Sequence, residues 1–130
     1  MDKKKAIEYW LKSAEHDRQV VKHLFDNKDY SYALFFGHLT IEKILKAIYV
    51  DRCGTVPPFT HSLNLLAEKA SLKLTEEQTR LFTIISRFNI EARYADYKFI
   101  FWKQCTKEYT KKYLFKIEEI KQWLLNQIQS

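Results

Sequence analysis

The sequence predicts an all-α protein, an up-and-down four-helix bundle with one extra short helix, in a single domain over residues 1–130. It contains only two glycines and two prolines, and Pro57 and Pro58 are adjacent, so few residues interrupt long helices. Apolar residues recur at intervals of three and four over most of the chain, which is the period of an amphipathic helix. A length of 130 residues and an apolar fraction of 46% suit one domain with its own core.

The first two helices are predicted from about Lys4 to Phe25 and from about Tyr30 to Arg52, with Asp29 as a candidate N-cap of the second. The short turn between them makes the two helices antiparallel. The second helix is apolar on more than one side, which is typical of a helix that is central or faces a second subunit. Gly37 lies inside it, where glycine costs about 1 kcal/mol relative to alanine. Close approach of a neighbouring helix would explain this glycine.

The remaining helices follow the two prolines. A short third helix is predicted to begin after Thr60 or Ser62, either of which can act as its N-cap, and to end near residue 70. The segment Thr75–Gln78 has the pattern of a capping box and opens the fourth helix, which Arg93 ends. The last helix is predicted from about Thr106 to Gln127.

Composition limits the classes of partner. The net charge of +6, from 22 basic and 16 acidic side chains, permits a polyanionic ligand and is equally compatible with a surface charged for solubility. No apolar run approaches the roughly 20 residues of a membrane span, and Met1–Lys5 leads into an amphipathic stretch. We therefore expect a cytoplasmic protein with no membrane partner.

The two cysteines, Cys53 and Cys105, stand alone, without a neighbouring Cys or His at metal-ligand spacing. We expect reduced thiols, no metal and no cofactor. A dinuclear carboxylate centre is also excluded, because it needs Glu-x-x-His on two helices and no Glu here is followed by His at that spacing.

Three places break the helical pattern, and function is often found at such breaks. Asp17 falls on the apolar stripe of the first helix and therefore needs a cationic or hydrogen-bonding partner, either in an interhelix ion pair or in the wall of a cleft. His38, Glu42 and Lys46 are spaced four residues apart on the second helix, with Lys43 beside them. They are either ordinary helix-surface pairs or part of a site.

The third break is the segment Arg87–Lys103, where two arginines occur among aromatic residues. Arginine and aromatic rings together provide phosphate pairing and base stacking. The alternative interpretation is a loop that its aromatic side chains pin to the end of the bundle or to a second subunit.

These landmarks, in their order and spacing, resemble the HEPN family, the helical domain found beside minimal nucleotidyltransferases in prokaryotes. The similarity covers about residues 6 to 126 and rests on five motifs: Trp10-x-x-x-Ala14-x-x-Asp17, Tyr30-x-x-Ala33-Leu34-Phe35, Ile41-Glu42-Lys43-Ile44-Leu45-Lys46-Ala47, Thr60-His61-Ser62-Leu63 and Ala92-Arg93-Tyr94-Ala95-Asp96-Tyr97. The resemblance implies a homodimer whose interface forms a cleft. Many members are metal-independent ribonucleases, often toxins, that carry an Arg followed four to six residues later by His.

Arg93 matches that arginine and is the best catalytic candidate, but Tyr97, Lys98 and Phe99 stand where the His is expected. The pair Arg18 and His23 has the spacing and lies outside the motif's place on the chain. Tyr97 or Lys98 would be a poor base at neutral pH. Whether the chain is an enzyme therefore stays open.

Three functions are compatible with the sequence. The first is a nucleotide- or RNA-binding HEPN module, a dimer that works with a nucleotidyltransferase partner as toxin and antitoxin do, with a dimer cleft lined by six residues: Asp17, Glu42, Lys46, His61, Arg93 and Tyr97. His61 is alternatively only a residue of the capping region of the third helix. The second is a purely structural interaction bundle. The third is a metal-independent ribonuclease with a non-standard catalytic base.

Overall fold

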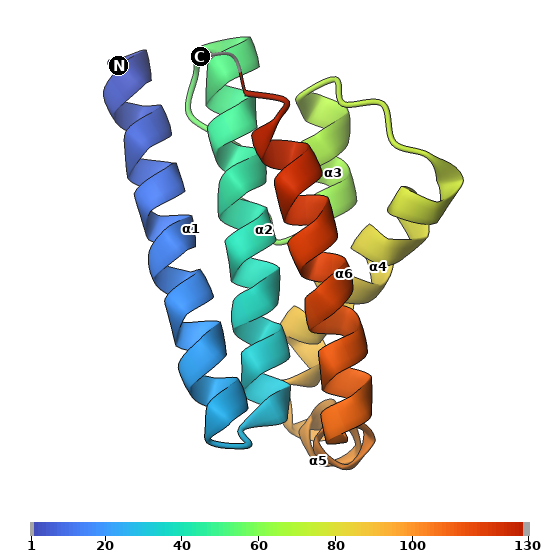
Figure 1. Ribbon diagram of the computed structural model, residues 1–130. Coiled ribbons are helices and arrows are strands. Elements are labelled where there is room, and N and C mark those ends of the chain that lie inside the picture. Colours follow the sequence, from blue (N-terminus) through green and yellow to red (C-terminus); the bar gives the residue numbers. More distant parts are fainter. Residues whose placement is uncertain (1, 129–130) are drawn as a thin grey trace.

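In a computed structural model that describes residues 2–128, the chain folds into helices without any strand among those residues (Figure 1). This confirms the all-α helical bundle that the sequence predicts. The helices are α1 (Lys3–Asp26), α2 (Tyr30–Cys53), α3 (Leu63–Lys69), α4 (Glu76–Glu91), α5 (Ala95–Gln104) and α6 (Lys107–Leu125).

Helix α2 is the centre of the bundle. The chain descends through α1, rises through α2, descends through α4 and rises again through α6, while the short α3 and α5 lie at opposite ends (Figure 1). Helix α2 packs against each of the other five helices. Its apolar side chains Leu34, Ile41, Leu45 and Ile48 are completely buried, as expected for a helix that is apolar on more than one side.

The helix ends largely follow their predicted caps. Ser62, one of the two candidates, caps α3 by accepting from the Leu65 amide. Thr75 and Gln78 form both hydrogen bonds of the predicted capping box of α4. Asp29 occupies the N-cap position of α2, but its side chain makes no capping hydrogen bond. Gly54 ends α2 with a φ of +70°, in the left-handed region that glycine adopts at low cost.

Helix α5 is the element that the sequence does not predict. Within the aromatic segment, Ala95–Gln104 forms a helix and not a pinned loop. Aromatic and apolar residues occur around its whole circumference, so they form no stripe of helical period. Phe101 is buried against Phe88 of α4, with ring centroids 5.5 Å apart, while Phe99 and Trp102 are 66% and 62% exposed.

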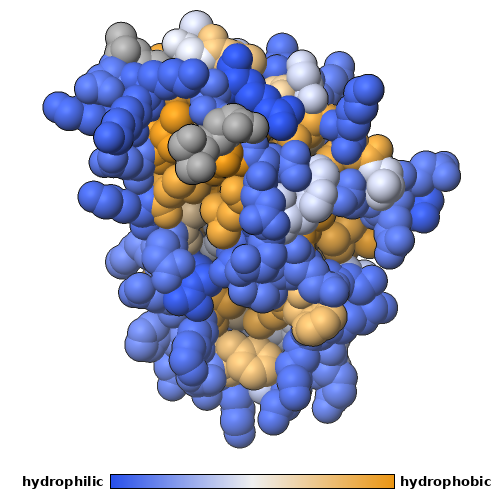
Figure 2. Space-filling view, turned by 45° about the horizontal axis from the view of Figure 1, so that its top comes forward, coloured by the Kyte–Doolittle hydropathy of each residue, from blue (hydrophilic) through white to orange (hydrophobic). Residues whose placement is uncertain are grey.

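The surface is mixed. Figure 2 shows a face on which hydrophilic side chains predominate and apolar groups are visible in patches between them. Within residues 2–128, no helix combines the length and the apolar character that crossing a membrane requires.

Gly37 faces α6 at short range, in agreement with the predicted close approach. A β-carbon at this position would lie 2.9 Å from Ile117 Cδ1, which is nearer than two carbon atoms pack without movement. The missing side chain therefore lets α6 pack directly on the backbone of α2.

We predict that Gly37→Ala stabilises the protein by less than helix propensity alone would give, because of Ile117. Alanine favours a helix by about 1 kcal/mol over glycine, but its methyl group must displace the Ile117 side chain. Ile117→Val removes the conflicting carbon, so Gly37→Ala should be more favourable by about 0.5–1 kcal/mol in that background. Urea unfolding of the four proteins of this double-mutant cycle measures the coupling. Additive effects would contradict the close approach.

Candidate functional site

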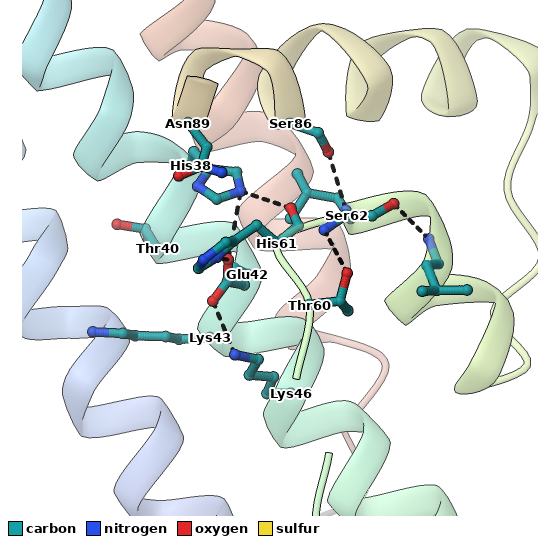
Figure 3. Close-up of polar contacts among 12 residues, drawn as sticks. His38, Thr40, Glu42, Lys43, Lys46, Thr60, His61, Ser62, Ser86 and Asn89 are labelled. Atoms are coloured by element: carbon teal, nitrogen blue, oxygen red, sulfur yellow. Dashed lines mark hydrogen bonds and ion pairs between the residues drawn. The ribbon is translucent and has the colours of Figure 1, made fainter. Parts of the chain in front are cut away.

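The carboxylate of Glu42 is the centre of the candidate site (Figure 3). Glu42 lies on α2 and is only 3% exposed. Its Oε2 accepts a hydrogen bond from Lys46 Nζ at 2.9 Å, and its Oε1 accepts one from His61 Nδ1 at 2.8 Å. His38 Nε2 lies 3.5 Å from the same Oε1. A buried charge requires such partners, because water no longer solvates it.

The segment before α3 carries His61 to this carboxylate. The Ser62 amide donates to the Thr60 hydroxyl at 3.1 Å, and the Leu63 amide donates to Ser86 Oγ of α4 at 3.0 Å. His38 Nε2 lies 3.0 Å from the main-chain oxygen of His61. Helix α2 therefore holds His61 at two points, by its ring and by its backbone, and α4 holds the residue that follows Ser62.

The partners of the two histidines assign their protons. The carboxylate of Glu42 only accepts, so His61 donates from Nδ1 and its Nε2 stays available. The His61 side chain is 50% exposed, and a ligand can therefore reach it. The carbonyl of His61 also only accepts, so His38 carries its proton on Nε2. His38 Nδ1 is buried and has no hydrogen-bond partner among the described residues.

Burial decides the charge of His38. Its side chain is fully buried, and loss of solvation lowers its pKa below the ordinary 6.5. The hydrogen bond to the His61 carbonyl and the charge of Glu42 act in the opposite direction, whereas the positive charge of Arg93 lowers the pKa further. His38 is therefore a neutral hydrogen-bond donor at pH 7, and the ring belongs to the scaffold of the site.

Lys46 links the site to α1. Its ammonium group is bonded to Glu42 and also lies over the Trp10 ring, 5.1 Å from the ring centroid. With its side chain only 11% exposed, Lys46 neutralises the carboxylate more than it offers a charge to solvent.

Arg93 lies just beyond the end of α4 and is exposed. Its Nε donates to the Asn89 carbonyl oxygen at 3.0 Å, and one Nη2 hydrogen is donated to Asn89 Oδ1 at 2.5 Å. Its guanidinium lies over the rings of Phe35 and Tyr94, 5.1 and 5.5 Å from their centroids. No acidic side chain within residues 2–128 forms a salt bridge with it. Arg93 is thus held in place with its charge unneutralised.

Asp17 and Tyr97, like Arg93, are predicted site residues that form no hydrogen bond or ion pair with Glu42. Asp17 is 4% exposed and forms an interhelix ion pair, in which Lys43 Nζ lies 2.6 Å from its Oδ2 without hydrogen-bond geometry. Tyr97 lies on α5 and is 49% exposed, and its ring makes no hydrogen bond or ring contact with the described residues. The structure therefore brings together Glu42, Lys46 and His61 from the predicted set.

Other chemistries find little support in this part of the chain. Among residues 2–128, no group of three or more His, Cys, Asp and Glu side chains is arranged to hold a metal ion. Burial raises the pKa of Cys105 to about 12, so its thiol stays protonated and is a poor nucleophile. Cys53 is exposed, and its thiol lies 3.6 Å from the Lys69 carbonyl oxygen.

Three residues of this region were not among the predicted ligands. Lys43 is the cationic partner that Asp17 needs, because Asp17 lies on the apolar stripe of α1. His38 was noted for its spacing of four residues to Glu42 but not assigned to the cleft, and Asn89 has the same spacing to Arg93. The burial of Asn89, which is only 6% exposed, results from tertiary packing, and no local sequence pattern predicts it.

Comparison with known proteins gives one finding. A sequence-family model described as "HEPN domain" matches residues 7–128, which is nearly the whole chain. No curated protein and no solved structure was found to match.

We predict that His38 makes the protein less stable in mild acid. In the unfolded chain His38 takes up its proton near the ordinary pKa of 6.5, whereas in the folded protein its pKa is lower. As the pH falls through 6.5, the unfolded state binds more protons, so the free energy of unfolding decreases, by at most about 1.4 kcal/mol per pH unit.

Urea unfolding between about pH 7.5 and about pH 5 tests this effect. His38→Gln keeps a donor toward the His61 carbonyl and should show a weaker dependence on pH than the wild type. His16→Gln, on the exposed face of α1, is the matched control for loss of a histidine. If the pH dependence of the free energy of unfolding weakened equally in both variants, His38 would not be its source.

Proposed function

The chain belongs to the HEPN domain family, and from this premise we propose that it binds a nucleotide or RNA through Arg93 and its surroundings. The family is one of nucleotide- and RNA-related helical modules. The finer assignment to this chain rests on the site: an exposed cation beside aromatic rings, next to a polar cluster that holds His61.

The observation that carries the proposal is the state of the Arg93 side chain. Asn89 uses two of the five N–H donors of a guanidinium, which leaves three for a ligand. The rings of Phe35 and Tyr94 support its plane. A planar, pre-positioned and unpaired guanidinium suits a phosphate oxygen, and the exposed ring of Tyr94 adds a surface on which a base can stack.

The other predicted ligands divide into two groups. Tyr97, on the first turns of α5, offers a second exposed ring, and His61 offers its free Nε2. Glu42 accepts a hydrogen bond from the His61 ring, and Lys46 neutralises Glu42, so both contribute to binding indirectly. Asp17 stabilises the contact of α1 with α2 through Lys43 and stands outside the proposed ligand site.

A metal-independent ribonuclease is the second candidate, and the pair His61–Glu42 favours it. A buried carboxylate that accepts from one ring nitrogen orients an imidazole and leaves the other nitrogen for proton transfer. His61 is then the non-standard base in place of the histidine that is missing after Arg93. Incubation of RNA with the wild type, His61→Ala and Arg93→Ala separates the candidates. Cleavage that both variants abolish indicates the enzyme, and intact RNA indicates the binding module.

Assembly completes the proposal. Members of the family often dimerise, and α5 presents exposed apolar side chains beyond the bundle, among them Ile100 at 71% and Trp102 at 62%. Such side chains are typical of interaction surfaces. We propose a homodimer through this face, in which Arg93 lies close to the interface. The partner in the cell would be a nucleotidyltransferase, in a toxin–antitoxin-like pair.

We predict that Arg93→Ala weakens binding of ATP or a short single-stranded RNA by tenfold or more, since loss of one arginine contact to nucleic acid costs about 1–3 kcal/mol. Arg93→Lys should recover only part of the affinity, because lysine lacks the planar fork. Arg80→Ala, at the exposed opposite end of α4, removes the same charge and is the control.

Calorimetry or fluorescence anisotropy at two salt concentrations measures this binding. The slope of log K against log salt should fall by about one for RNA in Arg93→Ala. Equal losses in the Arg80 and Arg93 variants would reduce the effect to net charge. No binding by the wild type to any nucleotide would leave the structural interaction bundle.

We predict that Trp102→Glu converts a dimer into a monomer, since a charge in an apolar interface is costly to desolvate. Phe115→Glu on α6 is the matched control, because Phe115 is 65% exposed outside α5. Sedimentation velocity over a range of concentrations measures the two species. A wild type that is monomeric throughout, or a dimer that only Phe115→Glu disrupts, would contradict the assignment of α5.

A further inference from the structure

A second polar site lies beside Asn89, the residue that also holds Arg93. A cavity of about 270 Å³ opens between the segment that carries His61 and helix α4. It is lined mainly by polar side chains, among them Asn64, Ser86, Arg87 and Asn89, and no lining residue carries a carboxylate. We propose that this cavity binds a phosphate group of the ligand. The proposal rests on the proposed function, because it adds a subsite to the Arg93 site.

Asn89 is the strongest evidence for a ligand. Only 6% of the residue is exposed, and Arg93 can only donate, so the oxygen of the amide must face Arg93. The amide nitrogen is then left without a hydrogen-bond partner among the described residues, in a side chain that lines the cavity. The amide nitrogen therefore keeps its two donor hydrogens for a group that enters the cavity. An acceptor such as a phosphate oxygen would satisfy it.

Further donors surround the same cavity. Arg87 is exposed and forms no salt bridge with an acidic side chain within residues 2–128. Glu91 interacts with it electrostatically and stands outside the lining. Ser86 Oγ accepts from the Leu63 amide, so its own proton is free to be donated. Figure 3 shows Ser86 and Asn89 on the same helix, with His61 on the segment beside it.

On balance this lining favours an anion: its donors outnumber Asn64 Oδ1, a buried acceptor without a hydrogen-bond partner among the described residues. Arginine, amide and hydroxyl donors converge without a competing carboxylate, which is the arrangement that recognises phosphate oxygens. The volume is smaller than the roughly 300 Å³ at which pockets for whole small molecules begin, so the base would stay outside. Because Asn89 joins the cavity to Arg93, one ligand can place a phosphate in the cavity and its base beside the rings near Arg93.

The experiment compares AMP with adenosine, which lacks the phosphate, by calorimetry and by NMR of the side-chain amides. Wild type should bind AMP at least tenfold more tightly than adenosine, and the Asn89 amide signal should shift only with AMP. Asn89→Asp keeps a partner for Arg93 and places a negative charge in the lining. It should abolish the preference for AMP while adenosine binding is retained, and Arg87→Gln should reduce the preference.

Asn27→Asp and Arg80→Gln are the controls, since both change charge outside the lining of the cavity. A single-stranded adenosine hexanucleotide distinguishes the source of the phosphate. If the hexanucleotide binds more tightly than adenosine and AMP does not, the cavity binds the phosphate of an RNA backbone. If AMP itself binds more tightly than adenosine, the cavity binds the phosphate of a free nucleotide.

Failure of the subsite and failure of the proposed function give different results. If Arg93→Ala loses binding while Asn89→Asp and Arg87→Gln bind AMP as wild type does, the phosphate subsite is wrong and the Arg93 site stands. If the Arg87 and Asn89 variants lose the preference while Arg93→Ala has no effect, the Arg93 site is wrong. If wild type binds none of the probes, both are overturned.

Discussion

One buried negative charge organises this bundle. The carboxylate of Glu42 lies on the central helix, where water cannot solvate it, and its contacts with Lys46 and His61 connect α2 to α1 and to the segment before α3. His61, on the segment before α3, donates a hydrogen bond to this carboxylate. Lys46 donates another, and its ammonium group lies over the Trp10 ring of α1. Because such a charge is tolerated only when it is paired and hydrogen-bonded, these contacts are obligatory. The position of the candidate site follows from them.

Most of the fold could be predicted because its determinants are local. Helical periodicity, the capping box at Thr75 and the turn after α1 each act within a few residues, and the structure has these elements where the pattern indicates. Gly37 predicted a close helix contact because a glycine in a helix interior needs compensation. Helix α5 was missed since its partners are distant in sequence: Phe101 packs against Phe88, and nothing in the order of its residues distinguishes that face from the exposed one.

The candidate site was predictable only in part, for the same reason. Glu42 and Lys46 are one helical turn apart, and periodicity alone places them together. His61 lies 19 residues from Glu42 and reaches it through a loop whose course the sequence does not define. Asp17 signalled correctly that it needs a cation, but the pattern could not show that Lys43 completes the pair within the bundle. The role of these residues as ligands stays a prediction.

The double hold on His61, through ring and backbone, separates the site from the loop that precedes it. The stretch from Gly54 to Phe59 is largely exposed, with Val56 and Phe59 at 72% and 101%. Its ends are fixed by the last turn of α2 on one side and by His61 on the other. Insertions or deletions between these two anchors would therefore leave the geometry around Glu42 intact. This is the place where relatives of the protein can differ in length, or carry an added segment that selects a partner.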